Sequence, residues 1–372
     1  MVDLKVQYEK ISTEINNTIK SVLNSTAFIK GPEVKIFEEE LQRYLGIRHV
    51  ISCANGTDAL QIAMMALELK PGDEVITTNF TFISTVEVVA LLGLKLVIVD
   101  PEEDSYNIST EAIRKTITSK TRAIVPVHLF GQCANMEEIM KIAADNNLYV
   151  IEDAAQATGA AFMFRNGNVK KAGTIGHIGT TSFFPSKNLG CYGDGGALYT
   201  DDDNIAKKMR SIANHGMKIK YYHDDIGVNS RLDTIQAAIL SVKLKNLDSY
   251  NAARKAVADF YDKAFSGCPY IKVPERVSYS SHIFHQYTIR LRNGKRKELK
   301  DFLETNRIPS LIYYPVPLHM QEAYSYLGYK AGDFPVTEML CREVISLPMY
   351  PELDQEQLDY ITTNVLKFFE KQ

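Results

Sequence analysis

Short apolar runs alternate with helix-like segments through the first half of the chain, and this alternation restricts the fold more than any other feature. The apolar runs occupy residues 49–53, 74–77, 95–99, 123–127 and 148–151. They are nearly continuous rather than alternating with polar residues, which is typical of strands buried on both faces. The segments between them, residues 59–69, 83–93, 109–118 and 136–146, have helical apolar spacing. The pattern predicts an α/β domain whose mainly parallel sheet is covered by helices on both faces.

Segments outside this alternation predict further helices and a second, smaller domain. Helices are expected over residues 5–23, 33–45, 232–244 and 247–265, the last as a bridging helix. The C-terminal part differs in texture, with predicted strands at 286–291 and 310–314, a helix at 296–306 and a final helix from Asp354, where Gln357 completes a capping box. We therefore expect a large α/β domain over residues 1–245, and a bridging helix with a small α+β domain over residues 246–372.

Composition excludes several classes of protein. The net charge of −3 gives no electrostatic case for binding nucleic acid or an anionic membrane. No apolar run is long enough to span a bilayer and the N-terminal residues lack a signal-peptide core, so we expect a cytoplasmic protein without a membrane partner. The 5 cysteines are scattered without a Cys-x-x-Cys pair, and no His-Glu-x-x-His occurs, so neither a disulfide framework nor a metal site is expected.

One lysine stands out by its surroundings. Lys187 lies in the stretch 181–196 among aromatic, small and glycine residues, with no other cation in that stretch. A desolvated lysine loses its proton more easily, and the neutral amine can form a Schiff base with an aldehyde. The alternative is a lysine that caps a loop or pairs with Asp194.

Other candidates follow the carboxyl ends of the predicted strands, where ligands gather in such sheets. Asp153 ends a strand and could hold a proton on a pyridine nitrogen, or simply cap the next helix. Gly56-Thr57-Asp58 precedes a helix and suits a phosphate, or serves as a plain N-cap. Phe82 could lie flat on a ring or pack in the core.

Seven motifs occur in an order that together resembles a known family. They are Asn-Gly-Thr-Asp-Ala-Leu (55–60), Phe-Thr-Phe-Ile-Ser-Thr (80–85), Ile-Glu-Asp-Ala-Ala-Gln (151–156), Ser-Phe-Phe-Pro-Ser-Lys-Asn-Leu-Gly (182–190), Gly-Asp-Gly-Gly-Ala (193–197), Gly-Val-Asn-Ser-Arg-Leu-Asp (227–233) and Tyr-Pro-x-Pro-Leu-His (314–319). Over nearly its whole length the chain resembles the DegT/DnrJ/EryC1/StrS family of sugar aminotransferases. The resemblance implies pyridoxal 5'-phosphate (PLP, or PMP in its amine form), the aspartate aminotransferase-like fold type I, and a homodimer.

The resemblance also implies a role for each matching residue. Around the cofactor ring, Lys187 would be the Schiff-base lysine, Asp153 would pair with the pyridinium nitrogen, Gln156 would hydrogen-bond the ring hydroxyl, and Phe82 would stack on the ring.

The phosphate and the substrate would be bound by residues further from the ring. The residues implied for the phosphate are Thr57, the backbone at Asp58, Ser182 and Asn229. Asn229 would reach the cofactor of the neighbouring subunit, so that each site needs two chains. The residues implied for the substrate side are Arg231, Tyr314 and His319.

The implied reaction moves an amino group from glutamate, which leaves as 2-oxoglutarate, to a keto group on a nucleotide-linked sugar. Relatives that carry His in place of the lysine are dehydratases, and Lys187 favours transamination. The wording of the motifs is most similar to enzymes that aminate C3 of UDP-2-acetamido-2-deoxy-3-oxo-D-glucuronate for O-antigen synthesis, although Tyr313 stands where these carry His. The alternatives are a dTDP-3-keto-6-deoxyhexose, amination at C4, or a regulatory relative that binds cofactor or sugar without turnover.

Overall fold

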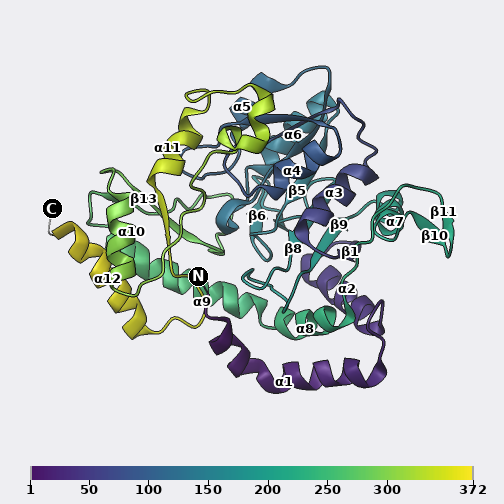
Figure 1. Cartoon of the computed structure of the whole chain (residues 1–372), viewed down its shortest axis with the longest axis horizontal. Coiled ribbons are helices and arrows are strands. Elements are labelled where there is room, and N and C mark those ends of the chain that lie inside the picture. The colour runs from purple at the N-terminus through teal and green to yellow at the C-terminus, as the bar shows by residue number, and fades with distance from the viewer. Residues whose placement is uncertain (1, 371–372) are drawn as a thin grey trace.

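A seven-stranded sheet is the largest element of the computed structural model, which describes residues 2–370 (Figure 1). Its strand order is β1-β9-β8-β5-β4-β2-β3. The strands are β1 (His49–Cys53), β2 (Glu74–Thr78), β3 (Lys95–Val99), β4 (Thr121–Val125), β5 (Tyr149–Asp153), β8 (Ile178–Ser182) and β9 (Gly196–Thr200). Strand β9 is antiparallel to both of its neighbours, and the other pairs are parallel. The predicted mainly parallel sheet is confirmed.

Helices cover both faces of this sheet. Alternate residues of one strand belong to different cores: Val75 packs in a core shared with one set of helices, and Ile76 in a core shared with the other. The first set is α3 (Gly56–Ala66), α4 (Ser84–Leu91) and α7 (Asp203–Ile212). The second set is α5 (Thr110–Thr116) and α6 (Met136–Asn146). This two-sided burial explains why the apolar runs in these strands are nearly continuous.

Three further helices pack together at the edge of the sheet that carries β1. They are α1 (Leu4–Ser25), α2 (Pro32–Leu45) and α8 (Thr234–Leu244). Helix α1 lies alongside α8 in Figure 1, and Ile15 of α1 packs on Ile239 of α8. Asp3 caps α1 through hydrogen bonds from the backbone N–H groups of Lys5 and Val6.

The C-terminal segment builds a core of its own around a three-stranded antiparallel sheet. The sheet contains β12 (Ile271–Lys272), β13 (Tyr287–Leu291) and β14 (Val344–Leu347). The helices of this part are α9 (Leu247–Phe265), α10 (Arg296–Thr305), α11 (Pro335–Glu343) and α12 (Gln355–Glu370). The expected capping box is confirmed, because the Asp354 N–H donates to Gln357 Oε1 at 3.1 Å and the Gln357 N–H donates to Asp354 Oδ1 at 2.8 Å.

Smaller elements connect these parts. They are the hairpins β6 (Ala161–Met163) with β7 (Val169–Lys171) and β10 (Met217–Ile219) with β11 (Tyr222–His223), and the 3-10 turns η1 (Leu129–Gly131), η2 (Leu318–Met320) and η3 (Glu322–Leu327). The β10–β11 hairpin stands away from the body of the chain at the right of Figure 1.

One predicted strand is wrong. Residues 310–314 form no strand, and only Leu311 makes an isolated bridge to Ser346. The neighbour of β13 is instead β14. Pro309 and Pro315 flank the segment, and neither has an N–H to donate to a sheet.

Across residues 2–370, none of the helices has both the length and the apolar character that crossing a membrane requires.

Candidate active site

A cavity of about 610 Å³ opens where the parallel strands β2, β4, β5 and β8 end. This position follows from topology, because parallel strands bring the loops after them to one edge of the sheet. The cavity walls contain most of the residues that the sequence singled out. The predicted site residues among them are Thr57, Asp58, Phe82, Asp153, Gln156, Ser182, Lys187 and Tyr314.

Lys187 provides the amine in this cavity. The Lys187 side chain keeps some surface exposed to solvent, but the residues around its ammonium shield that group from water. Burial lowers the pKa of Lys187 from 10.5 to about 8, and the charge of Asp153 opposes part of that change. Within residues 2–370, no carboxylate lies within ion-pair distance of Lys187, so the alternative of a pair with Asp194 is not what the structure contains. A substantial fraction of this amine is therefore neutral near pH 8.

Asp153 is the carboxylate of the cavity. It ends β5 and is 6% exposed. One oxygen accepts a hydrogen bond from Thr85 Oγ1 at 2.8 Å, and the other accepts from the Ala155 N–H at 3.1 Å. The chain after Asp153 forms turns rather than the helix that the capping alternative required. Two neutral donors therefore hold the carboxylate in place at the cavity wall.

The N-terminus of α3 forms a cradle for an anion. The helix begins at Gly56, so Gly56-Thr57-Asp58 is its first turn rather than the residues before it. Asn55 caps the helix by accepting from the Asp58 N–H at 2.8 Å, so the backbone N–H of Asp58, which was predicted to bind the phosphate, is already used. The N–H groups of Gly56 and Thr57, in the first turn beside the cavity, have no intrahelical acceptor. Thr57 Oγ1 lies 2.7 Å from Ser84 Oγ, and hydroxyls of this kind add further donors.

Glycine at position 56 permits the close approach of a second element. A Cβ at Gly56 would lie 2.7 Å from the Cβ of Ser182, a distance that real structures essentially never show. Ser182 ends β8 and contributes its hydroxyl beside the start of α3. Two hydroxyls and two backbone N–H groups therefore lie close to the start of α3, which is a suitable environment for a phosphate.

Aromatic side chains and an amide line the opposite part of the cavity. Phe82 is 55% exposed, an unusual state for a phenylalanine, and its ring centroid lies 6.4 Å from that of Tyr314. Gln156 Nε2 donates to Tyr314 Oη at 3.1 Å, and Gln156 Oε1 accepts from the Phe130 N–H at 2.8 Å. Burial raises the pKa of Tyr314, so its hydroxyl stays protonated and can donate a hydrogen bond.

Among the cavity residues that the sequence reasoning missed, two are polar and come from far along the chain. His285 and Gln286 come from the C-terminal part, immediately before β13. His285 Nδ1 lies 3.2 Å from Asn188 Oδ1, and burial, together with the charge of Lys187, lowers the pKa of His285 well below 6.5. No local pattern marks these residues, because they reach the cavity only through the packing of the C-terminal part.

Three predicted residues lie outside the cavity of their own chain. Asn229 is exposed and Arg231 is partly exposed, at the loop before α8. His319 is buried, with its Nδ1 2.8 Å from Asn79 Nδ2 and its Nε2 3.4 Å from Glu338 Oε1. The implied substrate role of His319 is therefore not supported by its position, and the ring instead joins the loop after Tyr314 to the end of β2.

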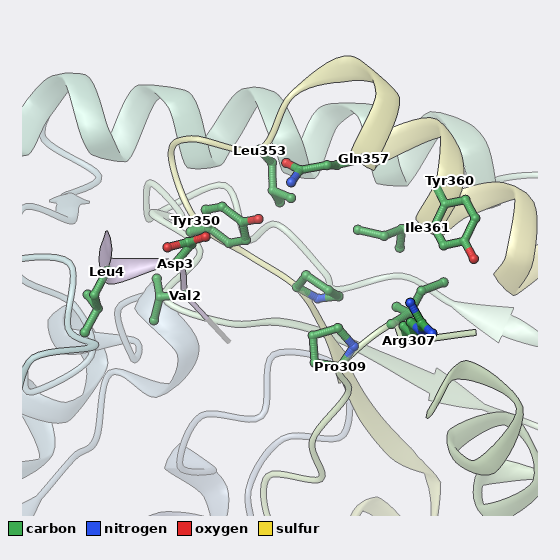
Figure 2. A pocket seen from close by; sticks show the side chains of 12 residues that line it. Val2, Asp3, Leu4, Arg307, Pro309, Tyr350, Leu353, Gln357, Tyr360 and Ile361 are labelled. Carbon is green, nitrogen blue, oxygen red and sulfur yellow. The ribbon is translucent and has the colours of Figure 1, made fainter. Parts of the chain in front are cut away.

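Another cavity, of about 580 Å³, lies between the N-terminal residues and the C-terminal part (Figure 2). Its walls contain apolar residues such as Leu353 and Ile361, with Asp3, Arg307 and Gln357 among the polar ones. Asp3 and Gln357 already serve as helix-capping residues. None of the predicted site residues lines this cavity, and the first cavity is therefore the candidate active site.

The residues of the first cavity fit a cofactor that has an aldehyde, a pyridine ring and a phosphate. Lys187 suits the aldehyde, Asp153 the ring nitrogen, and the start of α3 the phosphate. Two buried oxygen atoms of cavity residues, Thr81 Oγ1 and Gln286 Oε1, also have no hydrogen-bond partner within residues 2–370, as expected where a ligand supplies the missing partner. No group of His, Cys, Asp and Glu residues in the same range is arranged to hold a metal ion.

Comparison with known proteins extends this assignment. The model of the DegT/DnrJ/EryC1/StrS aminotransferase family matches residues 9–366. Over 97% of this chain and 97% of the relative, the sequence is 43% identical to a UDP-2-acetamido-2-deoxy-3-oxo-D-glucuronate aminotransferase from Pseudomonas aeruginosa. It is 46% identical, over 99% of this chain and 98% of the relative, to a pleiotropic regulatory protein from Geobacillus stearothermophilus.

A solved structure and a further relative are also similar to this chain over nearly its whole length. A crystal structure of DesV from S. venezuelae superimposes with a TM-score of 0.95 and 38% identity, covering 99% of this chain and 98% of that one. A dTDP-3-amino-3,4,6-trideoxy-alpha-D-glucose transaminase from Streptomyces venezuelae is also 38% identical, over 96% of this chain and 92% of the relative.

Proposed function

This chain belongs to the DegT/DnrJ/EryC1/StrS aminotransferase family, and we propose that it transfers an amino group from glutamate to the C3 keto group of a nucleotide-linked sugar. It is a PLP-dependent nucleotide-sugar aminotransferase of fold type I. The proposed transfer of an amino group rests chiefly on one cavity, which combines an amine, a fixed carboxylate, an anion cradle and an exposed aromatic ring. When bound there, PLP supplies an electron sink for the negative charge that develops on the reacting carbon.

Each residue of the cavity would have a separate role toward the cofactor. Lys187 would carry the aldehyde, and its amine, with a pKa near 8, would accept and return the proton of the reacting carbon. Asp153 would keep the ring nitrogen protonated, and Gln156 would orient the ring through its hydroxyl. Phe82 would cover one face of the ring. Gly56, Thr57 and Ser182 would hold the phosphate at the start of α3.

We further propose that two copies of the chain share each site. Asn229 is exposed and follows the β10–β11 hairpin in the chain. This hairpin presents apolar residues to solvent, since Tyr221 is 78% exposed and Tyr222 is 69% exposed. Ile226, between the hairpin and Asn229, is 88% exposed. Exposed apolar residues on a projecting hairpin favour an interface with another protein surface. In a homodimer this segment would bring Asn229 to the phosphate in the partner's cavity.

The proposed substrate is UDP-2-acetamido-2-deoxy-3-oxo-D-glucuronate, and the product would serve O-antigen or another surface polysaccharide. The identity of 43% to the Pseudomonas aeruginosa enzyme supports this choice. Arg231 forms a cationic surface with Lys30, because burial and the Arg231 guanidinium both lower the pKa of Lys30. Within residues 2–370 neither cation has a carboxylate partner, so the pair is available for a uronate or a diphosphate.

A product assay tests the substrate directly. The purified enzyme is incubated with glutamate and either the UDP-linked 3-oxo-uronate or a dTDP-linked 3-keto-6-deoxyhexose, and the amino sugar is detected by mass spectrometry. We expect product from the UDP sugar and, with Arg231→Gln, a marked rise in KM for that sugar. Product from the dTDP sugar alone would refute the proposed substrate and favour the activity named for the Streptomyces venezuelae relative.

A regulatory role without turnover is the second candidate, because one relative is named a pleiotropic regulatory protein. The intact Lys187 and Asp153 in one cavity argue for turnover. The purified protein with PLP should be yellow, and glutamate alone should bleach the visible band as the amino group moves to the cofactor. A protein that stays colourless with saturating PLP would refute the enzymatic proposal.

A further inference from the structure

Directly beside Asp153, a second carboxylate is buried behind the candidate active site. Glu152 is fully buried, and successive side chains of a strand point to opposite faces, so it lies on the face of β5 away from the cavity. One oxygen accepts hydrogen bonds from the N–H groups of Ile175 at 2.6 Å and Gly176 at 2.5 Å. The other accepts from the Gly173 N–H at 2.9 Å and lies 2.8 Å from His128 Nε2. Both oxygens are therefore fully used.

His128 links Glu152 to the backbone beyond β4. Its Nδ1 accepts a hydrogen bond from the Ala134 N–H at 3.1 Å, which places a proton on Nε2, the nitrogen that donates to Glu152. Burial alone would raise the pKa of Glu152, but the imidazole and the backbone N–H groups lower it further than burial raises it. The carboxylate is therefore ionised.

Other titratable groups near Glu152 do not balance its charge. The Cys133 thiol stays uncharged, because burial first, and Glu152 in addition, raise its pKa to about 12. His177 lies between the turn at residues 172–176 and β8, where its Nδ1 accepts from the Val150 N–H at 3.0 Å and burial lowers its pKa. Lys170 donates from Nζ to the Thr174 carbonyl oxygen of that turn at 3.3 Å, but within residues 2–370 it forms no ion pair with Glu152.

Glu152 joins the segments that carry the cavity residues. Through His128 it contacts the loop after β4, which includes Phe130, the hydrogen-bond partner of Gln156. Through residues 173–176 it contacts the turn that leads into β8 and on to Ser182 and Lys187. The backbone of Asp153 is itself fixed between these segments, since the His128 N–H donates to its carbonyl oxygen at 3.0 Å.

We propose that Glu152 is a positioning residue for Asp153, which sets the register of β5 against β4 and β8 and adds a second fixed negative charge behind the cofactor ring. The inference rests on the proposed role of Asp153 at the ring nitrogen. Two charges about 10 Å apart at an effective dielectric constant of about 20 interact strongly enough to move a pKa by about one pH unit. Glu152 therefore favours the protonated form of the cofactor linked to Lys187.

The test is a spectroscopic titration of the PLP-bound protein. The visible band of the cofactor on Lys187 changes with pH, and its midpoint is measured for the wild type and for Glu152→Gln. We expect the midpoint to fall by about one pH unit in E152Q, because the variant removes the charge but nearly preserves the shape. We also expect E152Q to bind PLP several-fold more weakly, measured by equilibrium dialysis.

Glu74→Gln is the matched control, since Glu74 is also a buried carboxylate, with 3% exposure. It lies at the start of β2, at the opposite end of the strands from the cavity. Both variants should lower the melting temperature, but E74Q should leave the midpoint unchanged. An equal midpoint in wild type and E152Q, with the band present, overturns the inference alone, whereas a wild type without any band overturns the proposed function.

A second variant covers the case in which E152Q does not fold. His128→Gln retains the carboxylate but loosens its contact with the loop after β4, so it should weaken PLP binding and leave the midpoint near that of the wild type. Glu152→Asp should also retain a midpoint near that of the wild type, because it keeps the charge. An H128Q protein that binds PLP as tightly as the wild type, or an E152D midpoint as low as that expected for the neutral variant, would refute the proposal.

Discussion

Replacing Lys187 by methionine should stabilise the cofactor-free protein at neutral pH. The wild type must desolvate a charged ammonium in the cavity, and this cost lowers the pKa of Lys187 from 10.5 to about 8. At roughly 1.4 kcal/mol for each pH unit, the change corresponds to at most about 3 kcal/mol. Because Lys187 borders an open cavity, water reduces that cost, and we expect a gain of about 1–2 kcal/mol in the free energy of unfolding for Lys187→Met.

The pH dependence distinguishes this cause from a simple packing effect. The unfolded chain holds the lysine proton up to pH 10.5, whereas the folded chain releases it near pH 8. The stability of the wild type relative to K187M therefore rises with pH between these values. The advantage of the variant should be complete below pH 8 and should disappear above pH 10.5.

Urea unfolding of the two apoproteins, followed by circular dichroism at several pH values, measures this difference. Lys35→Met is the control, because the Lys35 side chain is 82% exposed and its ammonium stays in contact with water in the folded chain. A K187M protein that is less stable than the wild type at pH 7, or whose advantage stays constant with pH, would refute the reasoning.

Three further substitutions test the cavity. Asp153→Asn should lower the pKa of Lys187 below about 8, since the Asp153 charge raises it. The same variant should slow transamination by roughly 100-fold or more. The pH dependence of amine acylation measures the pKa of Lys187, and an unchanged value would contradict this reasoning. Gly56→Ala places a Cβ 2.7 Å from Ser182 Cβ and should cost about 1–3 kcal/mol of stability and weaken PLP binding, whereas Gly267→Ala, with open space around it, should do neither in calorimetry and dialysis. Asn229→Ala should speed PLP loss, and mixing it with Lys187→Ala should produce heterodimers with one fully composed site; equal PLP retention in N229A and wild type would remove the support for a shared site.

The proposed catalytic group could be recognised from local chemistry. Lys187 stands in a stretch without another cation, and Asp153 ends an apolar strand, so both are unusual in ways that a sequence displays. The helices and strands of the first half were predicted because two-sided burial demands apolar runs, and glycine and proline residues bound them. The bridging helix, at Leu247–Phe265, was also predicted within its observed bounds.

Long-range packing decided the rest. Strand β9 enters the sheet between β1 and β8 against the direction of both, a placement that no local periodicity announces. His285 and Gln286 reach the cavity, and His319 is withdrawn from it, through the packing of segments far apart in the chain.

The amino-acid sequence therefore determined which segments become helices and strands and which side chains carry unusual chemistry, because these depend on neighbours along the chain. The tertiary structure decided which of these side chains meet, how far burial lowers the pKa of Lys187, and that Glu152 lies behind Asp153. These properties arise from desolvation and from hydrogen bonds between residues distant in sequence, such as the bonds from His128 and Gly173 to Glu152, and they exist only once the chain is folded.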